Sequence, residues 1–551
     1  MKNIKKFLFA ALFISTVLSC KKELDVKNNN QPVPETALTE KGIMAFAQGG
    51  IYRNGFVDLK HSDGVYGFFW SGAIGFHEMM GDAIGVEAAN AFINQIGCPD
   101  EVRLDDNSIV INPNSPKKQY DLIRLVNQNS NQGQNPLFYE WAYMYSMIAS
   151  CNFILVNIDK INIQVDSTTK KATLKAWAYW WKGFAYARIG SIYYAGIINN
   201  AAISATPIST NGNYVTKEAI IAESDKNLDL CSTTLDAVVT TTAHNSVMAT
   251  MIPSFCQVGK GGVISVAEWK RNVNTLKARN ILVNTKASAM SAAQWNAILT
   301  LTANGVLATD KVFTGRSNAA GDFLSPASGT VASKIQNALA GGNTYKLSER
   351  LVQEFKAGDK RLANNMAITT TWIGNSDRGN SFNTRYRLIN RGLGQVGVKV
   401  YTNTDPGGEE IFLASSYEEN ALMRAEALIN TSNIELGLAL VDAVRVSQGA
   451  GIAAVTGTGL TLVQAREELR RERRCALPFI GLSFYDARRY GFIDPVSAGG
   501  GRTGCVVLSK TGVVNTNARI DYNFLDFWDV PDNELAVNPP AAGSAPVRNP
   551  K

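Results

Sequence analysis

The sequence predicts a mainly α-helical fold, in which helix pairs form the scaffold and long loops with short strands complete it. Residues 138–158 and 168–194 carry wide apolar faces, which is typical of long helices buried between neighbours. Residues 415–430 and 433–449 also repeat apolar positions at helical spacing and indicate a further helix pair. We therefore expect helices to dominate both halves of the chain.

The composition is that of a globular protein with a large core. The chain has 551 residues, of which 45% are hydrophobic and 18% are charged. Its net charge of +7 falls to +4 without Lys2, Lys5 and Lys6, which is too mild and too scattered to indicate nucleic-acid binding. No run of 18 or more apolar residues predicts a membrane-spanning helix. Three distant histidines do not indicate a zinc site, and we expect no resident metal or cofactor.

The N-terminus has the pattern of an export signal. Basic residues precede an apolar run that is too short to span a bilayer, and Val17-Leu18-Ser19-Cys20 resembles a bacterial lipobox. We predict a lipoprotein signal peptide at 1–19, a lipidated Cys20 that anchors the chain, and a flexible tether over 20–38. The alternative is an ordinary secretory signal in which the cysteine is incidental.

The remaining elements follow in order along residues 39–551. Residues 39–55 predict the first helix, and 58–85 are dense in glycine and aromatic residues. Residues 86–136 are polar and irregular, which favours a long loop. Further helices are expected at 216–235, 264–284, 291–304 and 346–357. Loops with short strands are expected at 305–345 and 363–410.

Residues 461–491 form the most distinctive stretch of the chain. Thr461 and Gln464 can form a capping box at the start of a charged helix, and Glu467 can pair with Arg471 one turn later. Pro478 and Gly481 predict a break, after which a short helix ends at Gly491. The arginine run 470–474 indicates a solvated helix face, with an anion site as the alternative.

This stretch resembles the signature of the SusD/RagB family of outer-membrane nutrient-binding lipoproteins. The matching residues are Glu472, Arg473, Arg474, Leu477, Gly481, Asp486, Arg489 and Gly491. Ala476 and Ile480 replace glutamates of the family pattern and Ser483 replaces an arginine, which argues against a catalytic role for those positions.

Other segments extend the resemblance over nearly the whole chain. Tyr179, Gly183 and Tyr186 have the spacing of a tetratricopeptide repeat, the helix pair that forms the scaffold of this family. The segment 422–427 and the tail 524–540 are similar to further family motifs, and Glu426 with Arg445 could form an ion pair of the scaffold. The resemblance implies a SusD-like fold with an N-terminal part at 39–330 and a C-terminal part at 331–551.

The sequence offers little support for catalysis or redox chemistry. Gly392–Gly397 matches a dinucleotide fingerprint, but a strand-like segment follows it instead of a helix. Glu467, Glu468 and Glu472 lie among arginines, which should keep them ionised and unsuited to general acid catalysis. Six cysteines follow Cys20 without a Cys-x-x-Cys pair. The pattern favours mostly buried free thiols; in an oxidising compartment the six could instead pair, and the sequence does not choose among their fifteen connectivities.

Two aromatic loops are candidates for ligand binding. A sugar ring stacks on flat aromatic faces, and its hydroxyls pair with planar polar groups. For each aromatic residue, a place in the core is favoured over exposure on the surface. The candidates are Tyr66, Phe69, Trp70 and Asp82 in the first loop, and Trp372, Asn375, Arg378, Phe382 and Tyr386 in the second.

The resemblance implies a binding protein and not an enzyme. The expected role is to bind a glycan or oligosaccharide at the cell surface and deliver it to a TonB-dependent, SusC-like transporter of the outer membrane. The lipid anchor would then be the only membrane attachment. Two alternatives stay open: the same role for peptides or another nutrient, and a surface glycoside hydrolase.

Overall fold

The computed structural model describes residues 37–53, 69–86, 92–131, 135–201, 211–316, 330–335, 345–374 and 383–551. The predicted signal peptide, Cys20 and most of the predicted tether lie outside these residues.

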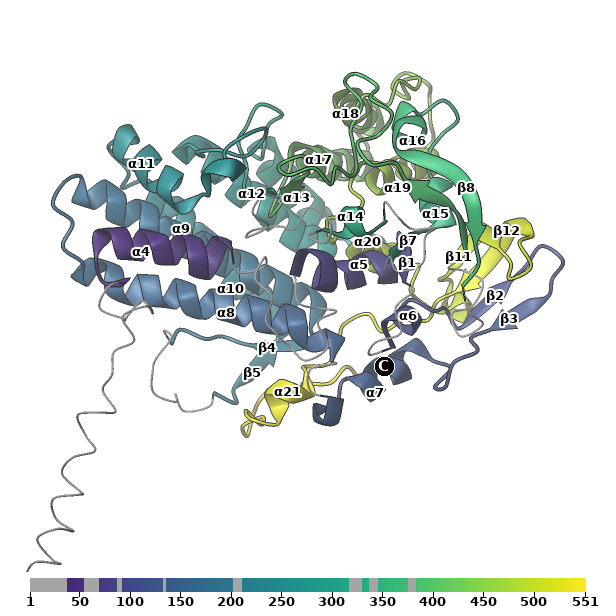
Figure 1. Cartoon of the computed structure of the whole chain (residues 1–551), viewed down its shortest axis with the longest axis horizontal. Coiled ribbons are helices and arrows are strands. Elements are labelled where there is room, and N and C mark those ends of the chain that lie inside the picture. The colour runs from purple at the N-terminus through teal and green to yellow at the C-terminus, as the bar shows by residue number, and fades with distance from the viewer. Residues whose placement is uncertain are drawn as a thin grey trace, which may run out of the picture.

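A layer of long helices forms the N-terminal part (Figure 1). Helix α9 (Ser167–Ile192) packs between α8 (Pro136–Asn157) and α10 (Lys217–Leu235), and α4 (Glu40–Ala47) lies beside them. Trp177 and Trp181 of α9 pack edge-on to each other and against Phe313 in the core. The wide apolar faces predicted this burial correctly. The layer continues through α11 (Thr241–Met251), α12 (Val266–Val283) and α13 (Ala292–Ala303).

The two long helices α9 and α10 approach closely at Gly183. A Cβ atom at this position would lie 2.9 Å from the Leu228 side chain and 3.2 Å from the Ser224 carbonyl oxygen. The Ser224 hydroxyl also donates a hydrogen bond to the Gly183 carbonyl over 2.7 Å. Gly183 is therefore the contact point that lets the backbones of the predicted repeat pair pack together.

A second group of helices forms the C-terminal part. Helices α17 (Tyr417–Asn430) and α18 (Ile434–Ser447) pair as predicted, and α19 (Leu462–Ala476) packs against both. Helix α13 packs against α17, so the two groups share an interface. The predicted capping box of Thr461 and Gln464 starts α19, and Gly481 has a φ of +80° in the predicted break before α20 (Ser483–Arg489).

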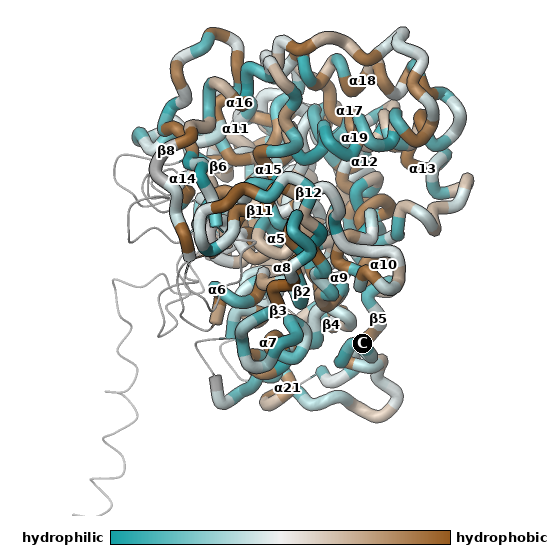
Figure 2. The backbone as a smooth tube through the Cα atoms, turned by 90° about the vertical axis from the view of Figure 1, so that its right-hand side faces the viewer, coloured by the Kyte–Doolittle hydropathy of each residue, from teal (hydrophilic) through white to brown (hydrophobic). Residues whose placement is uncertain are grey.

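Short antiparallel strands close one end of the molecule, which faces the viewer in Figure 2. A four-stranded sheet has the order β11 (Arg502–Leu508), β12 (Val514–Asp521), β2 (Glu101–Arg103) and β3 (Ile109–Ile111). It joins the C-terminal strands to the N-terminal part. The two-stranded sheets are β1 (Ile84–Val86) with β7 (Tyr345–Leu347), β4 (Ala195–Ile197) with β5 (Tyr214–Thr216), β6 (Thr314–Arg316) with β10 (Glu410–Phe412), and β8 (Met366–Trp372) with β9 (Thr384–Leu388).

Two sequence predictions about elements are wrong. Residues 86–136 do not form one long loop, because β2, β3 and two helices lie within them. Residues 346–357 are not a helix throughout, because β7 precedes a single helical turn. The remaining short helices are α5 (Ile74–Met80), α6 (Ile93–Ile96), α7 (Gln119–Val126), α14 (Val331–Ile335), α15 (Glu349–Val352), α16 (Lys360–Asn365) and α21 (Asp532–Leu535), with π-helical turns at Gln48–Tyr52 and Phe69–Ala73.

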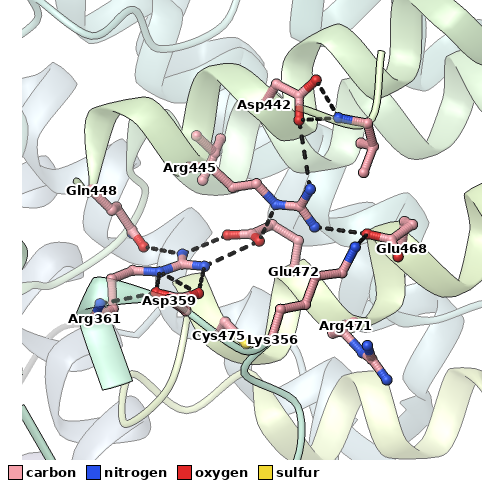
Figure 3. Close-up of polar contacts among 12 residues, drawn as sticks. Lys356, Asp359, Arg361, Asp442, Arg445, Gln448, Glu468, Arg471, Glu472 and Cys475 are labelled. Atoms are coloured by element: carbon pink, nitrogen blue, oxygen red, sulfur yellow. Dashed lines mark hydrogen bonds and ion pairs between the residues drawn. The ribbon is translucent and has the colours of Figure 1, made fainter. Parts of the chain in front are cut away.

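The charged helix α19 is a core element and not a solvated face. Glu472, Arg473 and Arg474 are buried, so the interpretation of 470–474 as a solvated helix face is wrong for these three residues. Glu472 accepts hydrogen bonds from Arg361 and Arg445 (Figure 3). Burial is possible because each charge meets an opposite charge.

Two predicted ion pairs have different partners in the structure. Arg445 pairs with Glu472 and Glu468, whereas Glu426 pairs with Arg489. Glu467 pairs with Arg470, three residues on, and not with Arg471. Helical spacing predicts which side chains can meet, but tertiary contacts decide between them.

The six cysteines after Cys20 are all free and buried, in agreement with the first of the two possibilities. Helix α8 with its 3-10 extension, Pro136–Lys160, is long and apolar enough to cross a membrane. More than half of its most apolar window is buried inside the protein, as expected of a core helix.

Candidate functional site

The first predicted loop does not place its described side chains on the surface. Phe69 and Trp70 are 1% and 7% exposed, and the Phe69 ring packs against Tyr143 with their centroids 5.8 Å apart. Asp82 is buried and accepts hydrogen bonds from Arg350 Nε and Nη2 over 2.9 and 2.7 Å. In contrast to the expected exposed platform, these three side chains belong to the core. Tyr66 lies outside the described residues.

The second predicted loop is a β-hairpin of strands β8 and β9. Trp372 and Tyr386 are partly exposed on it, and Lys346 Nζ lies 5.0 Å from the centroid of the Trp372 ring. Asn375, Arg378 and Phe382 lie outside the described residues. The structure thus retains two partly exposed aromatic residues of this candidate surface.

A pocket that sequence reasoning missed lies between α8, the segment after β4 and the C-terminal tail, elements that adjoin in Figure 1. Its volume is about 540 Å³, within the range of small-molecule sites. We call it the amide pocket, because four asparagines contribute to it. Its lining residues are Trp141, Tyr145, Ile197, Ile198, Asn199, Asn200, Ala201, Asn211, Glu534 and Asn538.

The aromatic residues of the amide pocket are held firmly by hydrogen bonds. Trp141 and Tyr145 are one helical turn apart on α8, with ring centroids separated by 4.5 Å. Trp141 Nε1 donates to Glu534 Oε2 over 3.2 Å. The Tyr145 hydroxyl donates to the Ile197 carbonyl and accepts from the Ile197 amide, at 3.1 and 2.6 Å. Because both polar ends are bound, the apolar parts of the rings keep fixed positions.

The polar side of the amide pocket comes from two distant chain segments. Asn538 Nδ2 donates to Glu534 Oε1 over 2.9 Å and to the Asn211 carbonyl over 3.0 Å. The buried Asn538 Oδ1 has no hydrogen-bond partner among the residues that the structure describes. On the opposite segment, Asn200 Oδ1 accepts from Lys182 Nζ over 2.7 Å. Burial lowers the pKa of Lys182. An unpaired buried acceptor favours a ligand that brings a hydroxyl donor.

This arrangement is suited to recognition of a neutral polyhydroxylated ligand. Ring edges offer apolar contact, while amides both donate and accept hydrogen bonds. Glu534 is the one carboxylate among the described lining residues, whereas glycoside hydrolysis uses two. Over the described parts of the chain, no group of three or more His, Cys, Asp or Glu side chains gathers as a metal site.

The sequence signals for this pocket are weak. Trp141 and Tyr145 lie within a helix whose apolar face predicts burial in the core. Trp141 is indeed buried. Glu534 and Asn538 lie in the tail, almost 400 residues later. Only the run of asparagines at 199–200 and 211 hinted at a polar site, and similar runs occur elsewhere in the chain.

Comparison with known proteins shows the fold. No family model and no curated protein sequence matches the chain. Solved structures do match over nearly its whole length. A sugar-binding protein, so described provisionally, from Bacteroides vulgatus has 17% identity and a TM-score of 0.55, with 91% of this chain and 98% of that chain covered.

Two further solved structures agree with this result. A SusD-like carbohydrate-binding protein from Bacteroides fragilis has 14% identity and a TM-score of 0.55, covering 92% of this chain and 99% of its own. A protein crystallised with a xylogluco-oligosaccharide has 13% identity and a TM-score of 0.54, and the match covers 94% of this chain and 99% of that protein's chain. The chain therefore has a SusD-like fold, as its sequence motifs predicted.

Proposed function

We propose that this chain, on its SusD-like fold, is a cell-surface lipoprotein of the outer membrane that binds a glycan or oligosaccharide. It delivers this ligand to a partner TonB-dependent, SusC-like transporter. The observation that carries the binding part of the proposal is the amide pocket, which combines fixed aromatic rings with amide groups and one unpaired acceptor. The carbohydrate ligand of one structure with the same fold supports the choice of ligand class.

The anchor and the partner rest on other observations. The lipobox at Val17–Cys20 supports lipid attachment, and the polar stretch after Cys20 supports a tether long enough to place the folded part over a transporter. Purification of the native lipoprotein from outer membranes in mild detergent tests the partnership. A barrel protein that co-purifies in stoichiometric amount is expected, and its consistent absence contradicts the delivery role.

Calorimetric titration of the chain without residues 1–20 tests the binding. The panel contains neutral oligosaccharides, including xylogluco-oligosaccharides, and short peptides, and each mixture is analysed for products. Saturable binding of an oligosaccharide without product is expected. Peptide binding alone contradicts the glycan proposal, and release of product contradicts a purely binding role.

Variants then locate the site. Asn538→Ala removes the unpaired acceptor, and we expect oligosaccharide affinity to fall about 2- to 10-fold, the effect of one lost hydrogen bond. Asn296→Ala, at an exposed position of α13, is the matched control and should bind normally. Trp372→Ala separates the two candidate surfaces. If it abolishes binding while Asn538→Ala has no effect, the β8–β9 hairpin holds the ligand.

A further inference from the structure

A second pocket, of about 380 Å³, lies between α15, α19 and β11, and its described lining residues differ from those of the amide pocket. Four arginines line it, together with Glu354, Glu467, Phe492 and the start of β11. We call it the arginine pocket. The arginines are Arg350, Arg470, Arg471 and Arg502.

Two of these arginines are fully engaged by protein carboxylates. Arg350 forms a bidentate pair with Asp82. Arg470 donates to both oxygens of Glu354, over 2.8 and 2.7 Å, in the same fork geometry. Although burial raises the pKa of Glu354, its hydrogen bonds with Arg470 lower it on balance. Glu354 is therefore ionised and has its oxygens occupied by Arg470.

Arg502 is buried in the arginine pocket and has no hydrogen bond from its guanidinium to the described part of the chain. Its side chain is 7% exposed, and its guanidinium lies 4.0 Å from the centroid of the Phe492 ring. The nearest carboxylate oxygens, of Asp82 and Glu354, are 3.9 and 4.0 Å away, too far for hydrogen bonds. Among the described residues, none accepts a hydrogen bond from this guanidinium, and its buried Nε is unpaired.

Arg471 is the second arginine with unused donors. Its Nε lies 3.7 Å from Glu354 Oε2, beyond hydrogen-bond distance, and has no hydrogen-bond partner in the described part of the chain. Figure 3 shows its side chain pointing away from the cluster around Glu472. Arg471 and Arg502 therefore both border the same pocket with donors to spare.

The local fold holds this positive charge in place. The pairing of β11 with β12 shifts register between Arg502 and Cys505, and such bulges re-aim side chains at the edge of a sheet. Gln353 fixes the bulged segment by hydrogen bonds to Gly504 and Val506. The pKa of the neighbouring Arg474 is lowered to about 10, mainly by burial and secondly by the positive charge of Arg502. The positive charges of Arg474 and Arg502 thus repel each other beside the pocket.

We infer that the arginine pocket is an anion-binding site in which Arg502 and Arg471 hold an oxyanion. Planar guanidinium groups suit a carboxylate or sulfate group, to which they donate paired hydrogen bonds. The pocket is larger than a single inorganic ion and accommodates a small organic molecule. The choice of an acidic sugar, such as a uronic acid, as that molecule rests on the proposed function.

Titration of the chain without residues 1–20 tests this site with defined probes. These are glucuronate, galacturonate, glucose, inorganic sulfate and inorganic phosphate. We expect both uronates to bind saturably and glucose to bind at least about tenfold more weakly. Uronate affinity should fall by about tenfold or more between roughly 50 and 500 mM sodium chloride, because salt screens the charges. Equal affinity for glucuronate and glucose would overturn the inference.

Charge-neutral variants assign the effect to the two arginines. Arg502→Gln and Arg471→Gln should each weaken uronate binding about tenfold or more, while Arg466→Gln, an exposed position of the same helix as Arg471, should not. Thermal unfolding of each variant confirms that it is folded. Unchanged uronate binding in both Arg502→Gln and Arg471→Gln overturns the site. Tighter binding of sulfate or phosphate than of uronates overturns the acidic-sugar class.

The result is separable from the test of the proposed function. Neutral oligosaccharides report on the amide pocket and Asn538, whereas uronates report on Arg502. If neutral oligosaccharides bind and uronates do not, only the anion site fails. If uronates bind and no neutral glycan does, the amide pocket fails and the anion site stands.

Discussion

Glu472 Oε1 accepts a hydrogen bond from Arg361 Nη1 over 2.6 Å in the protein interior, although 111 residues separate the two (Figure 3). Its other oxygen, Oε2, accepts from Arg445 Nε over 2.9 Å. Arg361 also pairs with Asp359, at the start of its own helix. One glutamate thus joins α16, α18 and α19, and it is a carboxylate partner of both Arg361 and Arg445.

Removing the charge of Glu472 should destabilise the protein strongly. Glu472→Gln leaves Arg361 and Arg445 buried with less negative charge, and we expect a loss of about 3–5 kcal/mol in the free energy of unfolding. Urea unfolding followed by circular dichroism measures this change. Asp229→Asn is the control, since its pair with Lys277 is 61% exposed on the aspartate side and should contribute at most about 1 kcal/mol. Equal effects of both substitutions would contradict the core role of α19.

The contact at Gly183 should not tolerate a larger side chain. Gly183→Val places atoms against Leu228 and the Ser224 backbone, and overpacking of this kind costs about 1–3 kcal/mol. The expected result is a lower thermal unfolding midpoint. Gly49→Ala is the matched control, because no atom lies within 4 Å of its added Cβ and alanine favours helical backbone. A midpoint for Gly183→Val equal to that of the wild type would show that α9 and α10 separate easily.

Asp82 should make the protein sensitive to acid. Burial raises its pKa, but the charge and hydrogen bonds of Arg350 outweigh burial and lower the pKa from 3.8 to about 2. A carboxyl group with a depressed folded-state pKa stabilises the fold above its unfolded pKa, and this contribution disappears as pH falls through about 2. The difference between the unfolded and folded pKa values of Asp82 corresponds to about 2 kcal/mol in the free energy of unfolding.

Urea unfolding between pH 5 and pH 2 measures this dependence. The wild type should lose about 2 kcal/mol more than Asp82→Asn over this range, because the variant has no carboxyl group to protonate there. The variant should also be less stable at neutral pH, since Arg350 stays buried without its partner. Parallel pH profiles for the two proteins would show that Asp82 does not titrate as its contacts indicate.

The six buried thiols should resist modification in the folded protein. Burial raises the pKa of Cys151, Cys231 and Cys475, which keeps these groups protonated and unreactive at neutral pH. A colorimetric thiol reagent should modify almost none of the six in the native chain without residues 1–20, and all six after denaturation without reductant. Fewer than six reactive thiols in the denatured protein would indicate a disulfide.

Periodicity predicted the helices well, and it failed where elements are short. The apolar faces of 138–158 and 168–194 identified α8 and α9, because long helices repeat their pattern many times. Strands β2 and β3 have three residues each, too few for an alternation to stand out in a polar segment. Helix α11 was missed for a similar reason, since threonine, alanine and asparagine give it little apolar contrast.

The candidate sites depended on tertiary contacts that the sequence does not encode locally. Aromatic density at 69–70 predicted a platform, but Phe69 packs against Tyr143 and Arg188, and Trp70 packs against Phe69, which places both rings in the core. The arginine run at 470–474 predicts a charged segment, but it does not indicate that Arg471 borders a pocket with Arg502. Which arginine finds a carboxylate depends on the bulge in β11 and on the position of α15.

The position of the tail determines when the amide pocket can exist during biosynthesis. Glu534 and Asn538 supply part of its polar lining, and the isolated bridge between Tyr193 and Trp528 attaches their segment to the long helices. A ribosome completes α8 and α9 hundreds of residues before it reaches this segment. The amide pocket is thus completed only after Glu534 and Asn538 have been synthesised, and a polypeptide truncated before Glu534 would lack the carboxylate and the amide that line it.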